Sequence, residues 1–385
     1  MAGEVADEIV VEHEGNEALD IEAEERDEFH DINKPWNPES IRVATKSFSL
    51  RNMLDQIEED SLDLAPDFQR LRVWRPVQKA QLIESILLQI PLPAFYFAED
   101  GEGTLRVVDG LQRLSTVYDF VRGGSDGRGG FPLEGLEYVA DVEGMRFADL
   151  PALWQRRIFN TQIIAHVIDP STPPPVMYDI FRRINTGGTP LNAQEIRHCM
   201  SKNRSRLFLK QLTEVPEFST ATGGAFDRQQ RMIDREVALR FSAFSLEDPA
   251  DYTEPMDEFL WMVTQRLDDA RDVTDKELDR LTARFVRGLT NARAIFGEHA
   301  FRKWPLAQDR RQPFNRALFE SWTVVLSDFS PKIVTAAAPK IRDAARTAMT
   351  EDIDYVQSVT ASTGDRRRVE RRFRVAREIV NTVTS

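Results

Sequence analysis

The chain has 385 residues, of which 41% are hydrophobic and 29% are charged, a composition typical of a soluble globular protein with two domains or one large domain. No apolar run approaches the length of a membrane span, and the acidic N-terminus does not resemble a secretory signal. The single cysteine, Cys199, excludes an internal disulfide and a cysteine-based metal cluster. We therefore expect a cytoplasmic protein.

The net charge of −13 is distributed unevenly along the chain. Residues 1–40 contain fourteen acidic and two basic residues, which leaves 49 acidic and 48 basic residues in the remainder. This first segment has few aromatic residues and no hydrophobic periodicity, so we expect an acidic disordered tail. Its role would be that of a solvating tail or, alternatively, of a nucleic-acid mimic that covers a basic groove until DNA displaces it.

Short strand and helix patterns alternate between residues 41 and 184. Strands are predicted over 41–50, 94–98, 105–108 and 162–168, with an extended segment over 62–68. Helices are predicted over 51–59, 76–89, 110–121, 153–158 and 176–184. This order indicates a mixed sheet covered by helices, in an α+β fold.

From about residue 191 onward the sequence shows helical patterns only. The predicted helices span 192–202, 205–214, 228–244, 256–270, 275–296, 314–326, 333–349 and 366–382. We therefore expect three parts: the acidic tail over 1–40, a mixed α/β domain over 41–200, and a helical domain over 201–385.

The strand over 105–108 breaks at Asp109-Gly110 and continues directly into a helix that contains Gln112 and Arg113. A helix start offers unpaired backbone N–H groups and a partial positive charge. Gly110 would let a ligand approach the backbone, Arg113 would bind phosphate, and Asp109 would hold a metal ion or orient a water. The turn is thus a candidate site for a phosphate-bearing ligand. The structural alternative is that Asp-Gly serves the turn alone.

Two further segments are rich in candidate binding residues. Gln69, Arg70 and Arg72 precede Trp74, and arginine beside tryptophan can hold a phosphate and stack a base; alternatively, Trp74 packs in the core. A second segment around Arg183 and Asn185 ends a helix, where Gly187 and Gly188 have ordinary capping chemistry.

The C-terminal helix contains seven arginines among the twelve residues 366–377. A helix with this charge could lie on a phosphate backbone. The candidate DNA-binding residues are Arg367, Arg368, Arg371 and Arg372. The alternative is a solvated helix face whose arginines pair with acidic residues elsewhere.

Three segments, Pro66 to Phe97, Leu105 to Phe120 and Ile180 to Cys199, occur in an order that resembles the N-terminal domain of GmrSD-type modification-dependent restriction systems. That family is grouped with the ParB/sulfiredoxin-like fold, and the resemblance covers roughly residues 42–200. Its DGQQR motif matches at Asp109, Gly110, Gln112 and Arg113, whereas Leu111 replaces the usual glutamine.

The resemblance implies a nucleotide-dependent or DNA-cleaving defence protein. It places Arg70 at a nucleotide pocket, and it implies that Arg183 and Asn185, which match the family's R-I-N motif, close over the same pocket. Glu195 and Arg197, a little further along, are interpreted as structural. The chain has neither a Walker loop nor a His-Asn-His nuclease pattern, so any nucleotide hydrolysis would not use a P-loop. The helical C-terminal part would have another role, or the protein would work with a separate nuclease subunit.

Our first hypothesis is a nucleoside triphosphate hydrolase in DNA restriction or phage defence. Asp109 would bind Mg²⁺ or water, Gln112 would position the attacking water, and Arg113 and Arg70 would neutralise phosphate charge. The alternatives are a nucleotide-binding DNA clamp or switch without turnover, a direct DNA nuclease, and a scaffold with a decayed pocket. Expected partners are DNA and a separate nuclease subunit, with a homo-oligomer as a further alternative; no membrane partner is expected.

Overall fold

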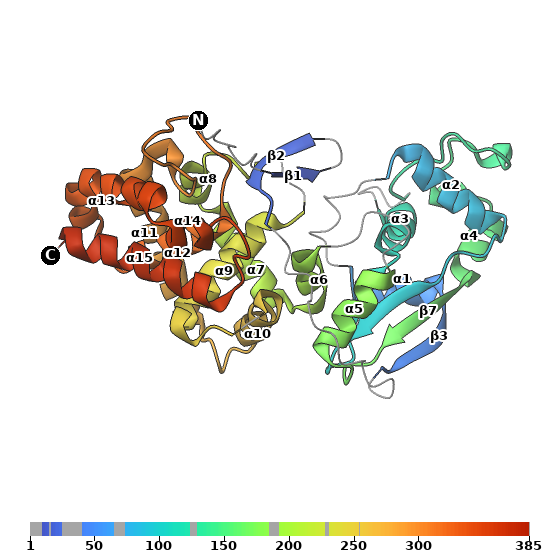
Figure 1. Ribbon diagram of the computed structural model, residues 1–385. Coiled ribbons are helices and arrows are strands. Elements are labelled where there is room, and N and C mark those ends of the chain that lie inside the picture. The colour runs from blue at the N-terminus through green and yellow to red at the C-terminus, as the bar shows by residue number, and fades with distance from the viewer. Residues whose placement is uncertain are drawn as a thin grey trace, which may run out of the picture. The chain divides into compact units, whose positions relative to one another are not determined.

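The computed structural model describes residues 10–14, 17–24, 41–64, 74–123, 129–184, 192–227, 231–253 and 255–384. The chain divides into two compact units. Residues 33–192 form an α/β unit, and residues 1–32 together with 193–385 form a helical unit (Figure 1). The predicted organisation, a mixed α/β part followed by a helical part, is confirmed.

A five-stranded mixed sheet is the centre of the α/β unit. Its strands are β3 (Val43–Ser49), β4 (Leu62–Asp63), β5 (Phe95–Glu99), β6 (Leu105–Asp109) and β7 (Gln162–Ile168). They lie in the order β3-β7-β5-β6-β4. The β3–β7 and β5–β6 pairs are antiparallel, and the β5–β7 and β4–β6 pairs are parallel.

Helices of the same unit bury one face of this sheet. They are α1 (Leu50–Glu58), α2 (Pro76–Leu87), α3 (Leu111–Arg122) and α4 (Ala152–Asn160). A fifth helix of the unit, α5 (Pro174–Ile184), follows β7 in the chain. Side chains of α1, α2, α3 and α4 join Phe95 and Phe97 of β5 in one hydrophobic core. Because alternate residues of a strand point to opposite faces, Tyr96 between them lies on the other face.

The predicted strands and helices of this unit are all present, with ends that differ by a few residues. The extended segment predicted over 62–68 is a strand at Leu62–Asp63, and its end lies outside the described residues. Hydrophobic periodicity is enough to predict these strands and helices, because each has one buried and one less buried face.

The helical unit is built around a buried helix, α12 (Arg316–Leu326), all of whose residues are buried. Helices α9 (Ile233–Leu246), α11 (Asp275–Phe296) and α15 (Arg366–Thr384) pack against it. The other α-helices described are α6 (Ala193–Met200), α7 (Asn203–Glu214), α8 (Pro216–Thr222), α10 (Met256–Asp268), α13 (Pro331–Glu351) and α14 (Ile353–Ser358). Helices α8 and α14 were not predicted, because each is too short to show a full apolar period.

The expectation of disorder over residues 1–40 is wrong for the part of this segment that the structure describes. Strands β1 (Val11–Glu14) and β2 (Glu17–Glu22) form an antiparallel hairpin. Ile21 is fully buried in the core of the helical unit. Its flanking residues pair with Phe314 through two backbone hydrogen bonds, from Glu22 N–H to Phe314 O (2.8 Å) and from Phe314 N–H to Asp20 O (2.9 Å). The acidic side chains form ion pairs with basic residues of the helical unit that are distant in the sequence.

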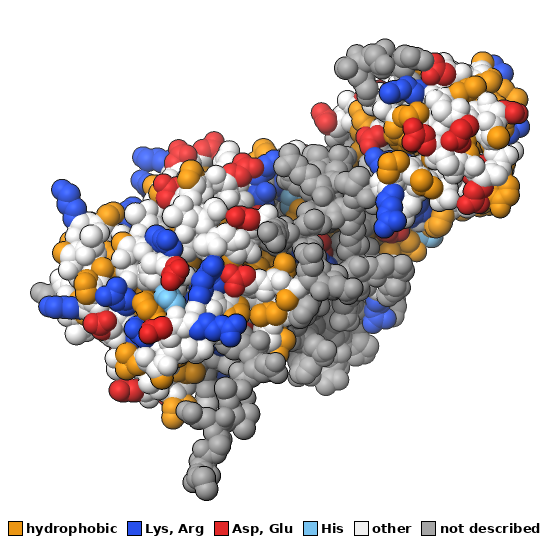
Figure 2. Space-filling model, turned by 90° about the horizontal axis from the view of Figure 1, so that it is seen from above, with side chains coloured by type: hydrophobic (Ala, Val, Ile, Leu, Met, Phe, Trp, Pro, Cys, Tyr) orange, Lys and Arg blue, Asp and Glu red, His pale blue; other side chains and the backbone are white. Residues whose placement is uncertain are grey.

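Basic and acidic side chains are intermixed on the face of the molecule shown in Figure 2. This agrees with the near balance of 48 basic and 49 acidic residues after residue 40. Among the helices of the described residues, none is both long enough and apolar enough to cross a membrane.

Candidate functional site

The strand-to-helix turn at Gly110 has a conformation that requires glycine. Gly110 has φ 97° and ψ 6° and is the N-cap residue of α3, directly after the last residue of β6. A Cβ atom at this position would collide with the ring of Phe95. The sequence suggested that Gly110 admits a ligand, but on that side the close neighbour is an aromatic ring of the core. The glycine therefore serves both the left-handed backbone and the packing of β5.

Arg113 ties this turn to the segment that leads into β5. Its Nη2 donates to Asp109 Oδ2 (2.9 Å) and to Ala94 O (3.2 Å), and its Nη1 donates to Pro93 O. The guanidinium also lies over the Phe95 ring, 4.3 Å from the centroid. Burial lowers the pKa of Arg113, and the charge of Asp109 opposes that shift. A guanidinium has five N–H groups, so these three bonds leave the Nε–H and one Nη1–H out of the network.

Asp109 presents the more accessible half of this ion pair. Its side chain is 39% exposed, compared with 13% for Arg113. Oδ2 accepts the hydrogen bond from Arg113, whereas Oδ1 takes no part in that bond. The described residues contain no group of three His, Cys, Asp or Glu side chains that could hold a metal ion. A Mg²⁺ ion would fit here only as one that keeps water and substrate phosphate ligands and takes one carboxylate oxygen from the protein.

A row of polar side chains, which the sequence analysis missed, crosses the sheet from this turn. The strand register pairs Asp109 with Tyr96, Tyr96 with His166, and His166 with Thr45. The Tyr96 and His166 rings lie 4.9 Å apart at an angle of 36°. Thr45 Oγ1 is 3.1 Å from His166 Nδ1. Tyr96, His166 and Thr45 lie on the face opposite Phe95 and Phe97. Arg113, the partner of Asp109, lies over the Phe95 ring, and the register of β5 with β6 is irregular between Tyr96 and Phe97.

Leu111 and Gln112 occupy the first turn of α3. Leu111 is partly buried against the core of the α/β unit, which explains how an apolar residue is accommodated where the related motif has an amide. Gln112 is half-buried, and its backbone carbonyl accepts a hydrogen bond from Thr116 Oγ1 (2.6 Å). The side chain of Leu111 thus contributes to packing.

Of the other three predicted nucleotide-binding residues, the structure describes only Arg183. Arg70 and Asn185 lie outside the described residues. Arg183 is an exposed residue near the end of α5. Trp74 is partly buried against the core of the α/β unit, as the packing alternative predicted. Glu195, interpreted as structural, is buried in α6 and pairs with Arg231 at 2.7 Å.

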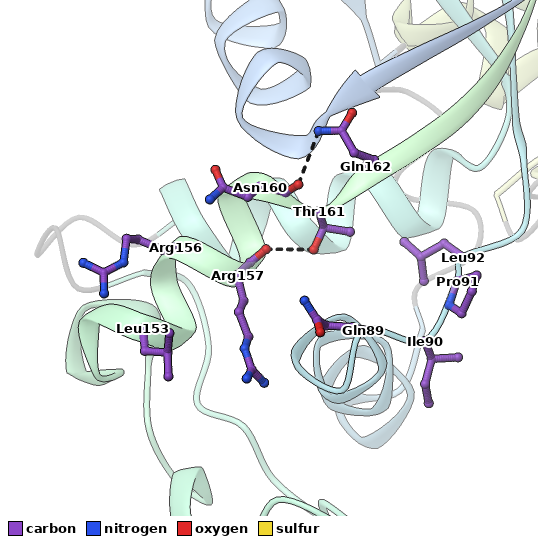
Figure 3. A pocket seen from close by; sticks show the side chains of 10 residues that line it. All are labelled: Gln89, Ile90, Pro91, Leu92, Leu153, Arg156, Arg157, Asn160, Thr161 and Gln162. Atoms are coloured by element: carbon purple, nitrogen blue, oxygen red, sulfur yellow. Dashed lines mark hydrogen bonds between the residues drawn. The ribbon is translucent and has the colours of Figure 1, made fainter.

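A cavity of about 460 Å³ lies between the end of α2 and the junction of α4 with β7 (Figure 3). Its polar lining includes Gln89, Arg157 and Asn160, and Arg157 Nη1 donates to Leu87 O (3.1 Å). Pro91 and Leu92, in its wall, directly precede the carbonyl groups that Arg113 holds. No local sequence pattern indicates this cavity, because its walls come from segments about 70 residues apart.

The structure changes the interpretation of the C-terminal arginines. Arg372 is fully buried, and its Nε donates to Glu320 Oε1 (2.8 Å), so it is removed from the candidate DNA surface. Arg371 pairs with Asp352, and Arg368 donates to Ala361 O. Arg367 is exposed. The sequence carried a signal for Arg372, since it shares the apolar stripe of α15 with Val369, Phe373 and Ala376.

The comparison with known protein families agrees with this picture. Residues 50–201 match the model of the family described as "GmrSD restriction endonuclease, N-terminal domain". The match includes β4, β5, β6 and β7 of the five-stranded sheet, leaves out β3, and ends just after α6. A search among curated proteins gave no match. Residues 50–201 therefore belong to the GmrSD restriction endonuclease N-terminal domain family.

Proposed function

We propose that the protein is a nucleotide-hydrolysing component of a DNA restriction or phage-defence system, with its nucleotide site at the Asp109–Arg113 turn. The family match supports the restriction or defence role. The observation that carries the nucleotide site is the turn itself, where Asp109 directly precedes the N-cap of α3 and bonds Arg113 through Oδ2 rather than Oδ1. Such a helix start favours phosphate.

In this proposal each residue of the turn has a distinct role. The N–H groups at the start of α3 bind a phosphate, and Asp109 holds Mg²⁺ or orients the attacking water. Mg²⁺ supplies neutralisation of phosphate charge when it is bound. Arg113 fixes the Asp109 carboxylate, because its Nη2 is already bonded to it. Gln112 positions the water, and Arg70, Arg183 and Asn185 contribute to nucleotide binding.

We further assign Tyr96 and His166 to the nucleoside end of the site. Adjacent strands are about 4.8 Å apart, so the backbone of His166, two strands from Asp109, is roughly 10 Å from the backbone of Asp109. That separation is comparable to the length of a nucleotide from its phosphates to its base. The paired rings, 4.9 Å apart, offer an aromatic surface on which a base can stack.

A switch without turnover is the second candidate, and the Arg113 network favours it. Three of the N–H groups of Arg113 are engaged by Pro93, Ala94 and Asp109. An arginine held in this way positions the turn rather than stabilising charge that develops during phosphoryl transfer. A direct DNA nuclease receives less support, because the described residues contain no three-ligand metal cluster.

DNA is the proposed partner, and a separate nuclease subunit would perform cleavage. A homo-oligomer is compatible with either arrangement. The distinguishing experiment uses the full chain and compares Asp109→Asn with Asp55→Asn, an exposed carboxylate of α1 that pairs with Arg122. Nucleotide binding and phosphate release are measured on both variants.

If the protein is a hydrolase, Asp109→Asn retains most nucleotide binding and loses turnover, whereas Asp55→Asn keeps both. A wild-type protein that binds nucleotide but releases no phosphate supports the switch. A wild-type protein that binds none of the four nucleoside triphosphates contradicts the proposed site.

A further inference from the structure

We propose that the helical unit has a surface for the phosphate backbone of duplex DNA, and that the acidic hairpin segment is its intramolecular occupant. The acidic hairpin segment is the described part of residues 10–24. The surface beneath it, called the cation surface here, consists of Arg240, Arg302, Lys303, Arg311 and Arg316. This inference rests on the proposed role on DNA and is independent of nucleotide hydrolysis.

Asp20 and Glu22 bind three residues of the cation surface from alternate positions of β2. Asp20 Oδ2 lies 2.9 Å from Arg302 Nη2 and 3.1 Å from Arg311 Nη2. Glu22 Oε1 lies 2.5 Å from Lys303 Nζ. Residues two apart on a strand lie on one side and are separated by about 6.6 Å. The carboxylates therefore form a regular row of negative charge, as the phosphates of a nucleic-acid strand do.

Glu12 and Glu24 bind two further arginines of the same surface. Glu24 Oε2 accepts from Arg240 Nη2 (2.6 Å), and Glu24 Oε1 accepts from Thr363 Oγ1 (2.9 Å). Glu12 Oε1 accepts from Arg316 Nη2 (3.0 Å). The hydroxyl and guanidinium groups around Glu24 are donors that would suit a phosphate oxygen equally well.

The charges of the two partners balance. Within this ion-pair network the helical unit contributes the five cations of the cation surface and Arg372, together with two acids of its own, Glu236 and Glu320. It therefore has a local net charge of +4. The acidic hairpin segment supplies four carboxylates, those of Glu12, Asp20, Glu22 and Glu24. Without an anionic occupant, the cation surface would have an excess of buried positive charge that Glu236 and Glu320 balance only in part.

The hairpin leaves two buried hydrogen-bond donors of the cation surface without a partner in the described part of the chain. Among the described residues, Arg302 Nε and Arg316 Nε are buried and have no hydrogen-bond partner. The segment is anchored by the buried side chain of Ile21 and by two backbone hydrogen bonds with Phe314. This anchor is small compared with a domain core, so a polyanion that makes several contacts can compete with it.

Phosphate is the ligand chemistry that fits this surface. Four of its five cations are arginines, whose planar fork binds phosphate oxygens in pairs. Among the five residues of the cation surface, Arg311 is the most accessible, with 39% of its side chain exposed. DNA would therefore first meet Arg311 and then compete with Asp20 for Arg302.

The first test measures binding of a fluorescein-labelled DNA duplex of mixed sequence to the full chain by anisotropy at several salt concentrations. Asp20→Asn loosens the contact with Arg302 and Arg311 and is expected to tighten DNA binding about threefold or more, because a larger fraction of the protein is then competent to bind. Asp309→Asn is the control, since Asp309 is an exposed acid that pairs with Arg346 outside the cation surface. Unchanged affinity of Asp20→Asn contradicts the inference.

A second variant tests the contact with phosphate. In the Asp20→Asn background, Arg311→Gln is expected to weaken binding and to lower the slope of log affinity against log salt by about one. Arg271→Gln is the matched control, because Arg271 is 91% exposed and pairs with Asp269 away from the cation surface. Equal effects of Arg311→Gln and Arg271→Gln overturn the assignment.

Hydrogen exchange then reports displacement directly. The amide of Glu22, which donates to Phe314 O, should lose protection when the duplex saturates the protein. DNA binding with unchanged protection of residues 18–24 contradicts the inference, as does absence of DNA binding by both wild type and Asp20→Asn. Exchange of hairpins between two copies, seen as concentration-dependent dimerisation of Asp20→Asn, also contradicts it. Phosphate release measured on the same samples shows separately whether the proposed hydrolase fails.

Discussion

Asp109 and Arg113 face each other across the first turn of α3, with 2.9 Å between Asp109 Oδ2 and Arg113 Nη2. The same Nη2 donates to Ala94 O, directly before β5. One guanidinium therefore fixes the end of β6, the start of α3 and the approach to β5. In the proposed site, Arg113 would therefore be a positioning residue and Asp109 the group that faces the ligand.

We predict that Arg113→Lys impairs activity more than it impairs stability. An ammonium group cannot reproduce the planar fork that reaches Asp109, Ala94 and Pro93 together. Loss of one or two of these bonds should lower the free energy of unfolding by about 1–2 kcal/mol. Misplacement of Asp109 should lower turnover roughly a hundredfold. Arg156→Lys, at an exposed position of α4, is the control, and equal turnover of the two variants refutes this role for Arg113.

Gly110→Ala should destabilise the α/β unit. The substitution places a Cβ at φ 97° and drives it into the Phe95 ring, which is held in the core. We expect a decrease of roughly 1–3 kcal/mol in the free energy of unfolding, measured by urea titration. Gly101→Ala is the matched control, because no heavy atom lies within 4 Å of a Cβ built there. If the two variants have the same midpoint, the turn does not require glycine.

Tyr96→Ala should separate recognition of the base from recognition of the phosphates. Removal of this ring takes away the stacking partner of His166, so nucleoside triphosphate binding should weaken by about 1–3 kcal/mol. Binding of inorganic tripolyphosphate should be unchanged, because the start of α3 stays intact. Calorimetric titration of both ligands into Tyr96→Ala and Tyr138→Ala, whose tyrosine is 75% exposed elsewhere in the unit, gives the comparison. Parallel losses for both ligands would assign Tyr96 to packing.

The stability of the helical unit should depend on pH through Glu24. Burial raises the pKa of this carboxyl, but Arg240 and Arg316 outweigh burial and lower the pKa from 4.5 to about 2. The folded-state pKa lies below the unfolded value, so the stabilisation is complete above about pH 4.5 and is lost as the pH falls toward 2. It amounts to on the order of 3 kcal/mol.

Urea titrations between pH 7 and pH 2 test this relation. Glu24→Gln should be less stable than wild type at pH 7, and the difference should shrink below pH 4.5. Glu258→Gln, at an exposed position of α10, should follow the wild-type curve. A difference between wild type and Glu24→Gln that does not vary with pH would show that the carboxylate charge is not the stabilising feature.

Elements that show a local hydrophobic periodicity can be predicted from the sequence. Elements whose stability depends on residues distant in the sequence cannot. The strand Gln162–Ile168 and the helix Asp275–Phe296 were predicted with their observed bounds. The acidic hairpin was not predicted, because its stability comes from Arg240, Arg302 and other cations more than 200 residues away. A hydropathy pattern cannot supply such partners.

The candidate site shows the same division. Asp109 and Arg113 were predicted together because one turn of helix brings them together. Tyr96 and His166 were missed, because their proximity depends on the register of strands separated by some 70 residues of sequence. Arg372 was placed on the surface because composition dominated the interpretation, although its position in the apolar stripe of α15 indicates burial.

The most direct test of the account is phosphate release by the full chain from ATP, GTP, CTP and UTP with Mg²⁺, with and without duplex DNA, beside Asp109→Asn. The account predicts turnover of at least one nucleotide by the wild type and its loss in the variant, with nucleotide binding largely retained. Undiminished turnover in Asp109→Asn would contradict the account by placing the hydrolytic site elsewhere in the chain.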